Sequence, residues 1–304
     1  MFGVGQGSSS RQASSSGRGM GGLKMRLLIA VGLALFALVS YYGNPGDQNQ
    51  ITGEVERVAM ADEQQEMALG RQAAPKMIEQ HRGVSRDAAK RERVAQMGRE
   101  LLVGLQQWIV RRIKEVEAET GRRIELQNPY QFNFTLLADS KTVNAFALPG
   151  GQVFITEALY DRLGSEGQLA GVLGHEIGHV IERHGNERMA EQQLFSGLAM
   201  AGGVAGGGDE SAMRMSQMAA QFISMKYGRE DELESDVWGV RLCVEAGYDP
   251  RAMIGLMKVL DEASPGGGPP EMMSTHPKPA NRIAYIQRVI QQEFPDGVPT
   301  GLTP

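Results

Sequence analysis

The sequence His175-Glu176-Ile177-Gly178-His179 lies within a largely apolar segment. In an α-helix, residues four apart differ by only ~40° around the axis, so the two imidazoles would project from one face. Two histidines at this spacing can hold a zinc ion, and the glutamate beside them can act as general base toward a water on that ion. Because so short a motif also arises by chance, the rest of the chain has to support it.

The residues around the motif predict a buried helix. Ser165 is a favourable N-cap, and Gln168 three residues later completes a capping box. The apolar positions that follow are Leu169, Val172, Leu173, Ile177, Val180 and Ile181. A histidine on a buried helix is more often a hydrogen-bonded core residue than a ligand, but two at this spacing with a glutamate between them reverse that expectation.

Two neighbouring residues narrow the kind of zinc site. His184 lies nine residues after His175, which would place it on the opposite face of a continuous helix, so we do not expect it to be a ligand. Gly185 stands where the metzincin pattern has a third histidine, and this excludes that arrangement.

A third protein ligand must come from elsewhere, because a catalytic zinc usually has three. The acidic segment Tyr227–Asp236 offers candidates at the start of a predicted helix. Glu232 and Asp236 are four apart and share one face, so the first could bind the metal while the second accepts a hydrogen bond from a ligating histidine. Spacing alone leaves Glu234 almost as good a candidate, and an acidic first turn that only complements the helix dipole is the alternative.

A β section precedes the motif helix. Gln131–Leu137 and Gln152–Thr156 are rich in strand formers, and Pro149-Gly150-Gly151 marks a turn before the second of them. The intervening Asn144–Leu148 would complete a hairpin whose exposed edge could pair with an extended peptide. On pattern alone, an ordinary hairpin that covers the helix is an equally good interpretation.

The remaining segments are mainly helical, so we expect a predominantly helical α+β fold with a small β hairpin or sheet beside the motif helix. The Gly-rich run Leu194–Gly208 predicts a mobile loop or helix end, with a lid or membrane-touching loop as the alternative. The other expected elements are helices over Asp62–Ala74, Arg86–Thr120, Met213–Met225, Ala252–Ala263 and Pro279–Phe294, and a loop over Ser264–Pro270.

The N-terminus predicts a membrane anchor. Residues 1–26 form an acid-free Gly/Ser-rich leader that we expect to be disordered, and residues 27–42 form an apolar signal-anchor. Basic residues before the span and acidic ones after it place the leader in the cytoplasm and the rest of the chain in the periplasm, in a single pass of a bacterial inner membrane. A cleaved signal peptide with secretion, or a mitochondrial presequence with an inner-membrane location, is the alternative.

The amino-acid composition limits which binding partners and which metal ligands we expect. The 304 residues include 36 Asp and Glu against 31 Lys and Arg, and this net charge of -5 gives no reason to expect nucleic acid. The single cysteine, Cys243, excludes an internal disulfide and a thiolate cluster, which leaves histidine and carboxylate ligands for a metal. No sequence feature sets an oligomeric state.

Five blocks together resemble a known family. The chain is similar to the membrane-associated gluzincin zinc metallopeptidases of the HtpX, Oma and CaaX prenyl endopeptidase type, and is closest to their bacterial periplasmic BepA-like branch. The blocks are Glu63–Ala74, Asn144–Gly151, Leu169–His184, Glu232–Asp236, and Ser274-Thr275-His276-Pro277 followed by Arg282. Ser235 stands where the family more often has alanine.

The resemblance implies a zincin-like fold and one zinc ion per chain. It implies His175, His179 and Glu232 as ligands, with Asp236 as the outer partner of a ligating histidine. Its other implied site residues are Glu176 as general base, His276 and Arg282 as further catalytic groups, and Asn144, Ala145, Phe146 and Ala147 as the substrate-binding strand. His276 would either cap the zinc in a closed state or, with Arg282, stabilise the tetrahedral intermediate.

The resulting hypothesis is a membrane-anchored zinc endopeptidase that hydrolyses misfolded or envelope proteins. The alternative is a zinc-stabilised chaperone or assembly factor for envelope proteins that cleaves little. The expected organisation has a linker over residues 43–61, a peptidase domain over 62–294 and a flexible tail over 295–304.

Overall fold

The computed structural model describes residues 19–206, 227–263, 272, 276 and 281–304. The expected helix over Met213–Met225 and loop over Ser264–Pro270 lie outside these residues. The chain divides into two compact units, which are described separately: residues 44–193 with 223–304, and residues 1–43 with 194–222.

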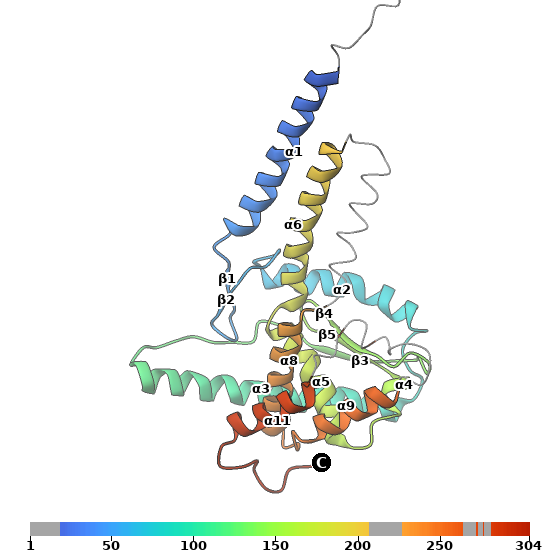
Figure 1. Ribbon diagram of the computed structural model, residues 1–304. Helices are drawn as coiled ribbons and strands as arrows, with labels where there is room; N and C mark the ends of the chain where they lie inside the picture. The colour runs from blue at the N-terminus through green and yellow to red at the C-terminus, as the bar shows by residue number, and fades with distance from the viewer. Residues whose placement is uncertain (1–18, 207–226, 264–271, 273–275, 277–280) are drawn as a thin grey trace, which may run out of the picture. The chain divides into compact units, whose positions relative to one another are not determined.

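The larger unit is helical except for two small sheets (Figure 1). Its helices are α2 (Glu63–Gln80), α3 (Ala88–Thr120), α4 (Glu157–Tyr160), α5 (Glu166–Ile181), α8 (Arg229–Glu245), α9 (Ala252–Glu262) and α11 (Arg282–Glu293). Helix α6 (His184–Ala205) begins in this unit. The expected predominantly helical α+β fold is confirmed.

A three-stranded sheet flanks the motif helix. It consists of β3 (Asn133–Leu137), β4 (Ala145–Leu148) and β5 (Gln152–Thr156), with β5 in the centre, parallel to β3 and antiparallel to β4. The predicted hairpin is therefore present as β4 and β5. Strand β4 lies at an edge of the sheet.

Helix α5 carries the His-Glu-x-x-His motif and starts where the sequence indicates. The Ser165 side chain accepts a hydrogen bond from the backbone N–H of Gln168, although the Gln168 side chain accepts from Gly164 rather than closing a capping box. A Cβ added to Gly178 would lie 2.9 Å from the Cβ of Trp238 on α8. Glycine is thus needed at this position for α5 and α8 to pack closely.

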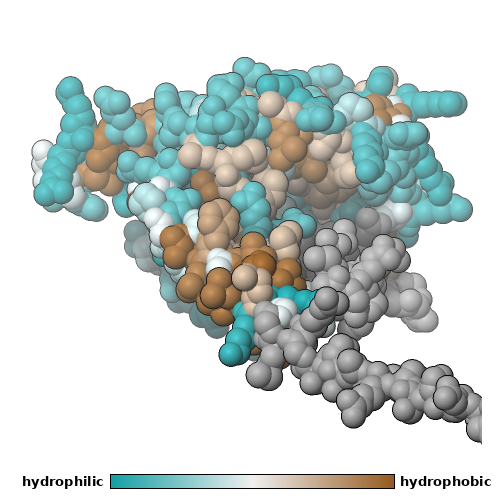
Figure 2. Space-filling model, turned by 90° about the horizontal axis from the view of Figure 1, so that it is seen from above, coloured by the Kyte–Doolittle hydropathy of each residue, from teal (hydrophilic) through white to brown (hydrophobic). Residues whose placement is uncertain are grey.

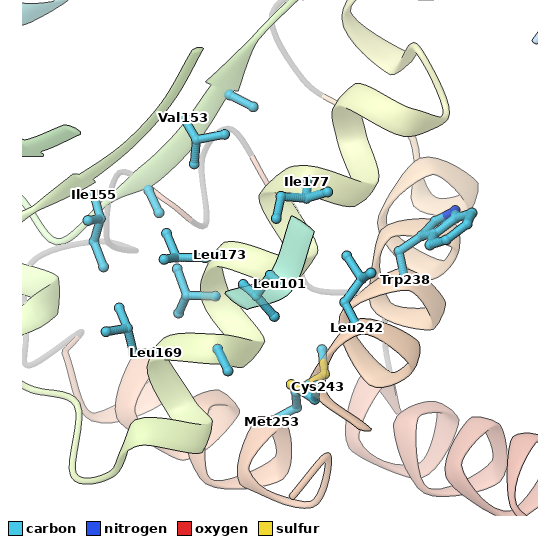
Figure 3. Close-up of a cluster of buried hydrophobic side chains, with 14 of the residues drawn as sticks. Leu101, Val153, Ile155, Leu169, Leu173, Ile177, Trp238, Leu242, Cys243 and Met253 are labelled. Carbon is cyan, nitrogen blue, oxygen red and sulfur yellow. The ribbon is translucent and has the colours of Figure 1, made fainter. Parts of the chain in front are cut away.

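The core surrounds α5. Figure 3 shows Leu169, Leu173 and Ile177 of α5 near Leu101 of α3 and Leu242 of α8, all of them buried. The expected long helix is present as α3 and ends at Gly121, whose φ of 65° suits glycine. Cys243 is buried in the same core, and burial raises the pKa of its thiol.

The segment over residues 43–61 is folded against the end of α5, in contrast to the expected linker. It forms two short strands, β1 (Asp47–Gln48) and β2 (Val55–Glu56), which pair antiparallel. The Asn49 side chain donates a hydrogen bond of 2.7 Å to the carbonyl of Ile181. Buried Arg183 binds Asp47 at 2.6 Å and Glu66 of α2 at 2.7 Å. These contacts attach the segment to the larger unit, whereas a linker would be free to move.

The segment over residues 295–304 is also attached, although a flexible tail was expected. Thr303 forms a bridge with Tyr248, and the backbone N–H of Gly167 donates a hydrogen bond of 3.0 Å to the carbonyl of Pro304. Only backbone groups make these bonds, so side-chain composition gave no signal for them.

The smaller unit contains α1 (Gly19–Tyr42), which begins before the expected Leu27. Residues 22–42 are long and apolar enough to cross a membrane. Most large side chains of α1 are exposed, and Figure 2 shows brown hydrophobic side chains gathered over this helix. The helix includes Lys24 and Arg26, and long basic side chains of this kind can reach the membrane surface from the end of a span.

The Gly-rich run after residue 193 is helical up to Ala205, as the end of α6, rather than an open loop. Within the smaller unit, a Cβ added to Gly197 would lie 2.7 Å from the Cβ of Ala37 on α1. Ala201 is buried as well. Small side chains thus allow this helix end and α1 to pack closely.

Candidate metal centre

Four buried side chains converge at one point of the larger unit. They are His175 and His179 of α5, Glu232 of α8, and His276. Each offers one donor atom, and all these atoms lie within 4.8 Å of one another. The structure therefore brings together the three ligands that the resemblance implies and His276, which the resemblance gave as a cap of the zinc or a catalytic group.

The donor spacing fits a tetrahedral metal ion. His179 Nε2 lies 3.1 Å from both His175 Nε2 and His276 Nδ1, and 3.4 Å from Glu232 Oε1. Ligands ~2.1 Å from a zinc ion in tetrahedral geometry stand roughly 3.4 Å apart. Ring nitrogens with lone pairs directed at one point repel one another unless a cation lies between them. Three imidazoles and one carboxylate form a donor set that suits zinc.

Local structure explains why these residues meet. His175 and His179 are one turn apart on α5, and Glu232 lies in the first turn of α8, which packs closely on α5 at Gly178. The backbone N–H of His276 donates a hydrogen bond of 2.7 Å to the carbonyl of Met272.

Asp236 is the partner of one histidine, at the place that the sequence predicted. Its Oδ1 lies 3.1 Å from His175 Nδ1. Arg282 of α11 donates two hydrogen bonds of 2.7 Å to the same carboxylate, and its Nη1 lies 3.1 Å from Glu232 Oε2. Arg282 thus holds two acidic side chains of the site.

The charges of these acidic groups follow from their partners. Burial alone would raise the pKa of Asp236, but the Arg282 charge and hydrogen bonds from His175 and Arg282 lower it. Burial also opposes ionisation of Glu232, yet the His276 charge and hydrogen bonds from three histidines lower its pKa below the ordinary value. Both groups are carboxylates at neutral pH.

Glu176 lies in the site without a hydrogen-bond partner among the described residues. Its side chain is fully buried, and the nearest cationic candidate is His276, whose Nε2 lies 3.8 Å from Glu176 Oε1. Burial raises the pKa of Glu176. A buried carboxyl with both oxygens unused is available to exchange a proton with a bound molecule.

His184 contacts the site, although the sequence placed it on the opposite face. That expectation is wrong because α5 ends at Ile181 and Arg183 adopts a φ of 52°. The chain therefore turns, and His184 Nδ1 lies 2.9 Å from His179 Nδ1. His184 Nε2 lies 3.0 Å from Glu234 Oε2. The two residues of this turn, Glu182 and Arg183, are neither Gly nor Pro, so a 100° count along the helix could not reveal it.

Tyr227 is a second residue that the sequence did not single out. Its ring stacks on His179, with centroids 4.1 Å apart and planes 20° apart. It also lies 5.1 Å from the His276 ring. An aromatic residue five positions before Glu232 matches no motif, so only the fold shows its place.

The predicted substrate strand forms the edge strand β4 and its preceding residue. The Asn144 carbonyl accepts a hydrogen bond of 3.0 Å from the Thr156 N–H. Hydrogen-bonded and non-hydrogen-bonded residue pairs alternate along an antiparallel ladder, so every second residue of β4 after Asn144 bonds to β5. The backbone groups of Ala145 and Ala147 consequently face the edge of the sheet that no described strand covers. Phe146 faces the other side of the sheet from Ala145, where it stacks on buried Phe154 in a second, smaller hydrophobic cluster.

Comparison with known proteins agrees with this geometry. The profile of peptidase family M48 matches residues 105–290. The beta-barrel assembly-enhancing protease of Escherichia coli (strain K12) is 33% identical over 181 residues, which cover 56% of this chain and 36% of that protein. The mitochondrial metalloendopeptidase OMA1 of Arabidopsis thaliana is 31% identical over 153 residues, which cover 50% of this chain and 30% of that protein.

The OMA1 metalloendopeptidase of Schizosaccharomyces pombe is 32% identical over 148 residues, covering 48% of this chain and 43% of that protein. The chain thus spans about a third of the length of the first of these curated relatives.

Proposed function

The chain belongs to peptidase family M48, and from this premise we propose that it is a zinc-dependent endopeptidase that hydrolyses peptide bonds of misfolded or envelope proteins. The observation that carries the proposal is the cluster of His175, His179, Glu232 and His276 beside Glu176, whose carboxyl oxygens have no hydrogen-bond partner among the described residues. A binding protein has no need of an unpartnered buried carboxyl at a metal site, since such a group destabilises the fold.

In the proposed mechanism, His175, His179 and Glu232 would hold a zinc ion. A zinc ion bound there would polarise the scissile carbonyl and make a water molecule acidic. Glu176 takes the proton from this water and passes it to the leaving amine, a transfer worth roughly 10²- to 10⁴-fold in rate.

We propose that a substrate peptide adds to the free edge of β4. The backbone groups of Ala145 and Ala147 face that edge, so an extended chain can pair with them as a further strand. The buried Asn144 Oδ1 has no hydrogen-bond partner among the described residues and could accept one from the peptide. Main-chain pairing would give affinity with little sequence preference, which suits unfolded substrates.

The contacts of His276 and Arg282 indicate different roles for these two residues. Arg282 is almost fully buried and already bonded to Asp236 and Glu232, so it positions the ligands and opposes their negative charge. His276 takes the fourth donor position of the cluster. We propose that it closes the site in this arrangement and has to move before a substrate binds.

A four-donor cluster also favours the second candidate, a zinc-stabilised chaperone or assembly factor, because structural zinc sites have four protein ligands. In both cases the apolar helix α1 would anchor the chain in a bacterial inner membrane, with residues 1–18 in the cytoplasm and the metal centre in the periplasm.

Proteolysis assays separate the two candidates. Full-length protein in detergent is incubated with unfolded casein, with and without a zinc chelator. We expect chelator-sensitive cleavage that is lost in Glu176→Gln and retained in Glu230→Gln, a matched change at an exposed residue of α8. Zinc content should be unchanged in both variants. Equal cleavage by wild type and Glu176→Gln would exclude the mechanism, and zinc binding without any cleavage would favour the chaperone.

A further inference from the structure

We propose that His184 and Glu234 form a hydrogen-bonded relay that fixes the ring and the tautomer of His179 and so sets the metal affinity of the centre. The proposal rests on the proposed function, because it assumes that His179 binds a metal ion. It gives roles to two residues that take no part in the mechanism above.

The relay consists of two short contacts in series. Glu234 Oε2 lies 3.0 Å from His184 Nε2, and His184 Nδ1 lies 2.9 Å from His179 Nδ1. The side chains of His179 and His184 are each 1% exposed, whereas that of Glu234 is 59% exposed. The relay therefore runs from the metal centre to the protein surface.

A carboxylate at one end and a neutral His184 ring in the middle set the direction of both bonds. A carboxylate only accepts, so His184 donates its Nε2–H to Glu234. The neutral His184 ring then has a lone pair on Nδ1, which accepts the Nδ1–H of His179. This leaves the lone pair of His179 on Nε2, the atom that lies 3.1 Å from both His175 Nε2 and His276 Nδ1. The relay selects the one tautomer of His179 that can bind the metal.

The two ligating histidines are thus supported in different ways. His175 is held directly by Asp236, which Arg282 in turn neutralises within the protein. His179 is held through a second imidazole by a carboxylate that faces solvent. Ser235 is a further polar group near the junction, with its Oγ 3.4 Å from His184 Nδ1. Partners of this kind raise ligand basicity, and their loss typically weakens metal binding by 10- to 100-fold.

The direct test is zinc affinity, measured on the full-length protein by competition with a chromophoric chelator. His184→Leu removes the acceptor, and we expect zinc to bind roughly 10- to 100-fold more weakly. In His184→Asn, the amide oxygen can take the place of Nδ1 and accept from His179, so affinity should return to within about threefold of wild type. Equal weakening in both variants would overturn the relay, since it would indicate a packing role only.

Glu234→Ala tests the outer bond without altering the core. Water can replace the exposed carboxylate in part, so we expect an intermediate loss of about three- to tenfold in zinc affinity. Glu230→Ala is its matched control, because it removes the same charge from an exposed position of α8, and it should leave zinc affinity unchanged. Equal effects of these two substitutions would reduce the role of Glu234 to general electrostatics and overturn the outer half of the relay.

Two further readouts distinguish the failure of the relay from that of the metal centre. The visible absorption spectrum of the cobalt-substituted protein should change in His184→Leu and be restored in His184→Asn, because it reports ligand geometry. His175→Ala should abolish zinc binding. If it does so while His184→Leu binds like wild type, the relay alone is wrong. If wild type binds no zinc, both proposals are wrong.

Discussion

His276 Nδ1 lies 2.9 Å from Glu232 Oε1, although the two residues are 44 positions apart. The same nitrogen lies 3.1 Å from His179 Nε2. His276 therefore takes a donor position that a catalytic zinc site leaves to water or substrate. The centre has the donor set of a closed site, so the proposed activity requires this one side chain to move.

Replacement of His276 by alanine should open the fourth position. We expect His276→Ala to bind zinc about tenfold more weakly but, at saturating zinc, to cleave a short unstructured peptide several times faster than wild type. Initial rates with a fluorogenic peptide would measure this. A hundredfold fall in rate would instead indicate that His276 acts on the transition state.

Arg282→Met should destabilise the fold even without metal. The change leaves the carboxylates of Asp236 and Glu232 buried without their counter-ion, a loss of about 3–5 kcal/mol for a buried pair. Urea unfolding in the presence of a chelator measures this. Arg241→Met is the control: it breaks the partly exposed pair with Glu293 and should cost about 1 kcal/mol or less. Similar losses in the two variants would contradict the buried role of Arg282.

The sequence predicted those parts of the site that depend on a regular helix. The spacing of His175 and His179 is a property of one helix, and α5 places both rings together. Spacing could not decide between Glu232 and Glu234, because both lie near the start of α8. The tertiary packing decides: Glu232 is fully buried at the cluster, whereas Glu234 is exposed and binds His184.

The parts that could not be predicted depend on chain reversals and on contacts between distant segments. His184 reaches the site because Arg183 takes a left-handed conformation, which a non-glycine residue seldom adopts. The docking of Thr303 beside Tyr248 uses backbone groups alone. Neither feature leaves a periodic pattern in the sequence, and periodicity is the main signal that a single sequence offers.

Gly178→Ala should separate α5 from α8. The added methyl group would lie 2.9 Å from the Cβ of Trp238 and 3.0 Å from the Cα of Ser235, so α8 has to shift together with Glu232. We expect a loss of about 1–3 kcal/mol in stability, as for overpacking, and at least tenfold weaker zinc binding.

Gly174→Ala provides the comparison on the same helix. Its nearest neighbour would be the Gly239 Cα at 3.2 Å, so the contact is less severe. The better helix propensity of alanine, up to ~1 kcal/mol, should offset much of the cost. Thermal unfolding and zinc titration of both variants would measure the difference, and equal behaviour would show that the separation of α5 and α8 does not control the site.

Glu56→Gln should change how stability depends on pH. Burial raises the pKa of Glu56 to about 9 from its ordinary value of 4.5. Between these values the folded protein keeps a proton that the unfolded chain releases, so this group makes stability fall as pH rises, by up to about 1.4 kcal/mol per pH unit. Glutamine can still accept the bond from Asn49 and does not titrate.

We therefore expect wild type and Glu56→Gln to have similar unfolding free energies near pH 5, and the variant to be the more stable at pH 8. Urea unfolding from pH 5 to 8 provides the measurement. The decisive quantity is the difference in unfolding free energy between the two proteins, because the contributions of all other titrating groups cancel in it. A difference that does not vary with pH would show that Glu56 is already ionised in the folded protein.

The proposed orientation in the membrane can be tested with single cysteines. The native Cys243 is fully buried and its thiol pKa is raised, so a maleimide should not label wild-type protein in the folded state.

Positively charged residues flank the N-terminal side of the apolar helix, which predicts a cytoplasmic N-terminus. In cells with a permeabilised outer membrane, an impermeant maleimide should label Thr300→Cys at once, but Ser15→Cys only after the inner membrane is opened. The opposite pattern would reverse the orientation. Loss of the Ser15→Cys label from the mature protein in detergent would show that the leader is cleaved, and the anchor would then have to be abandoned.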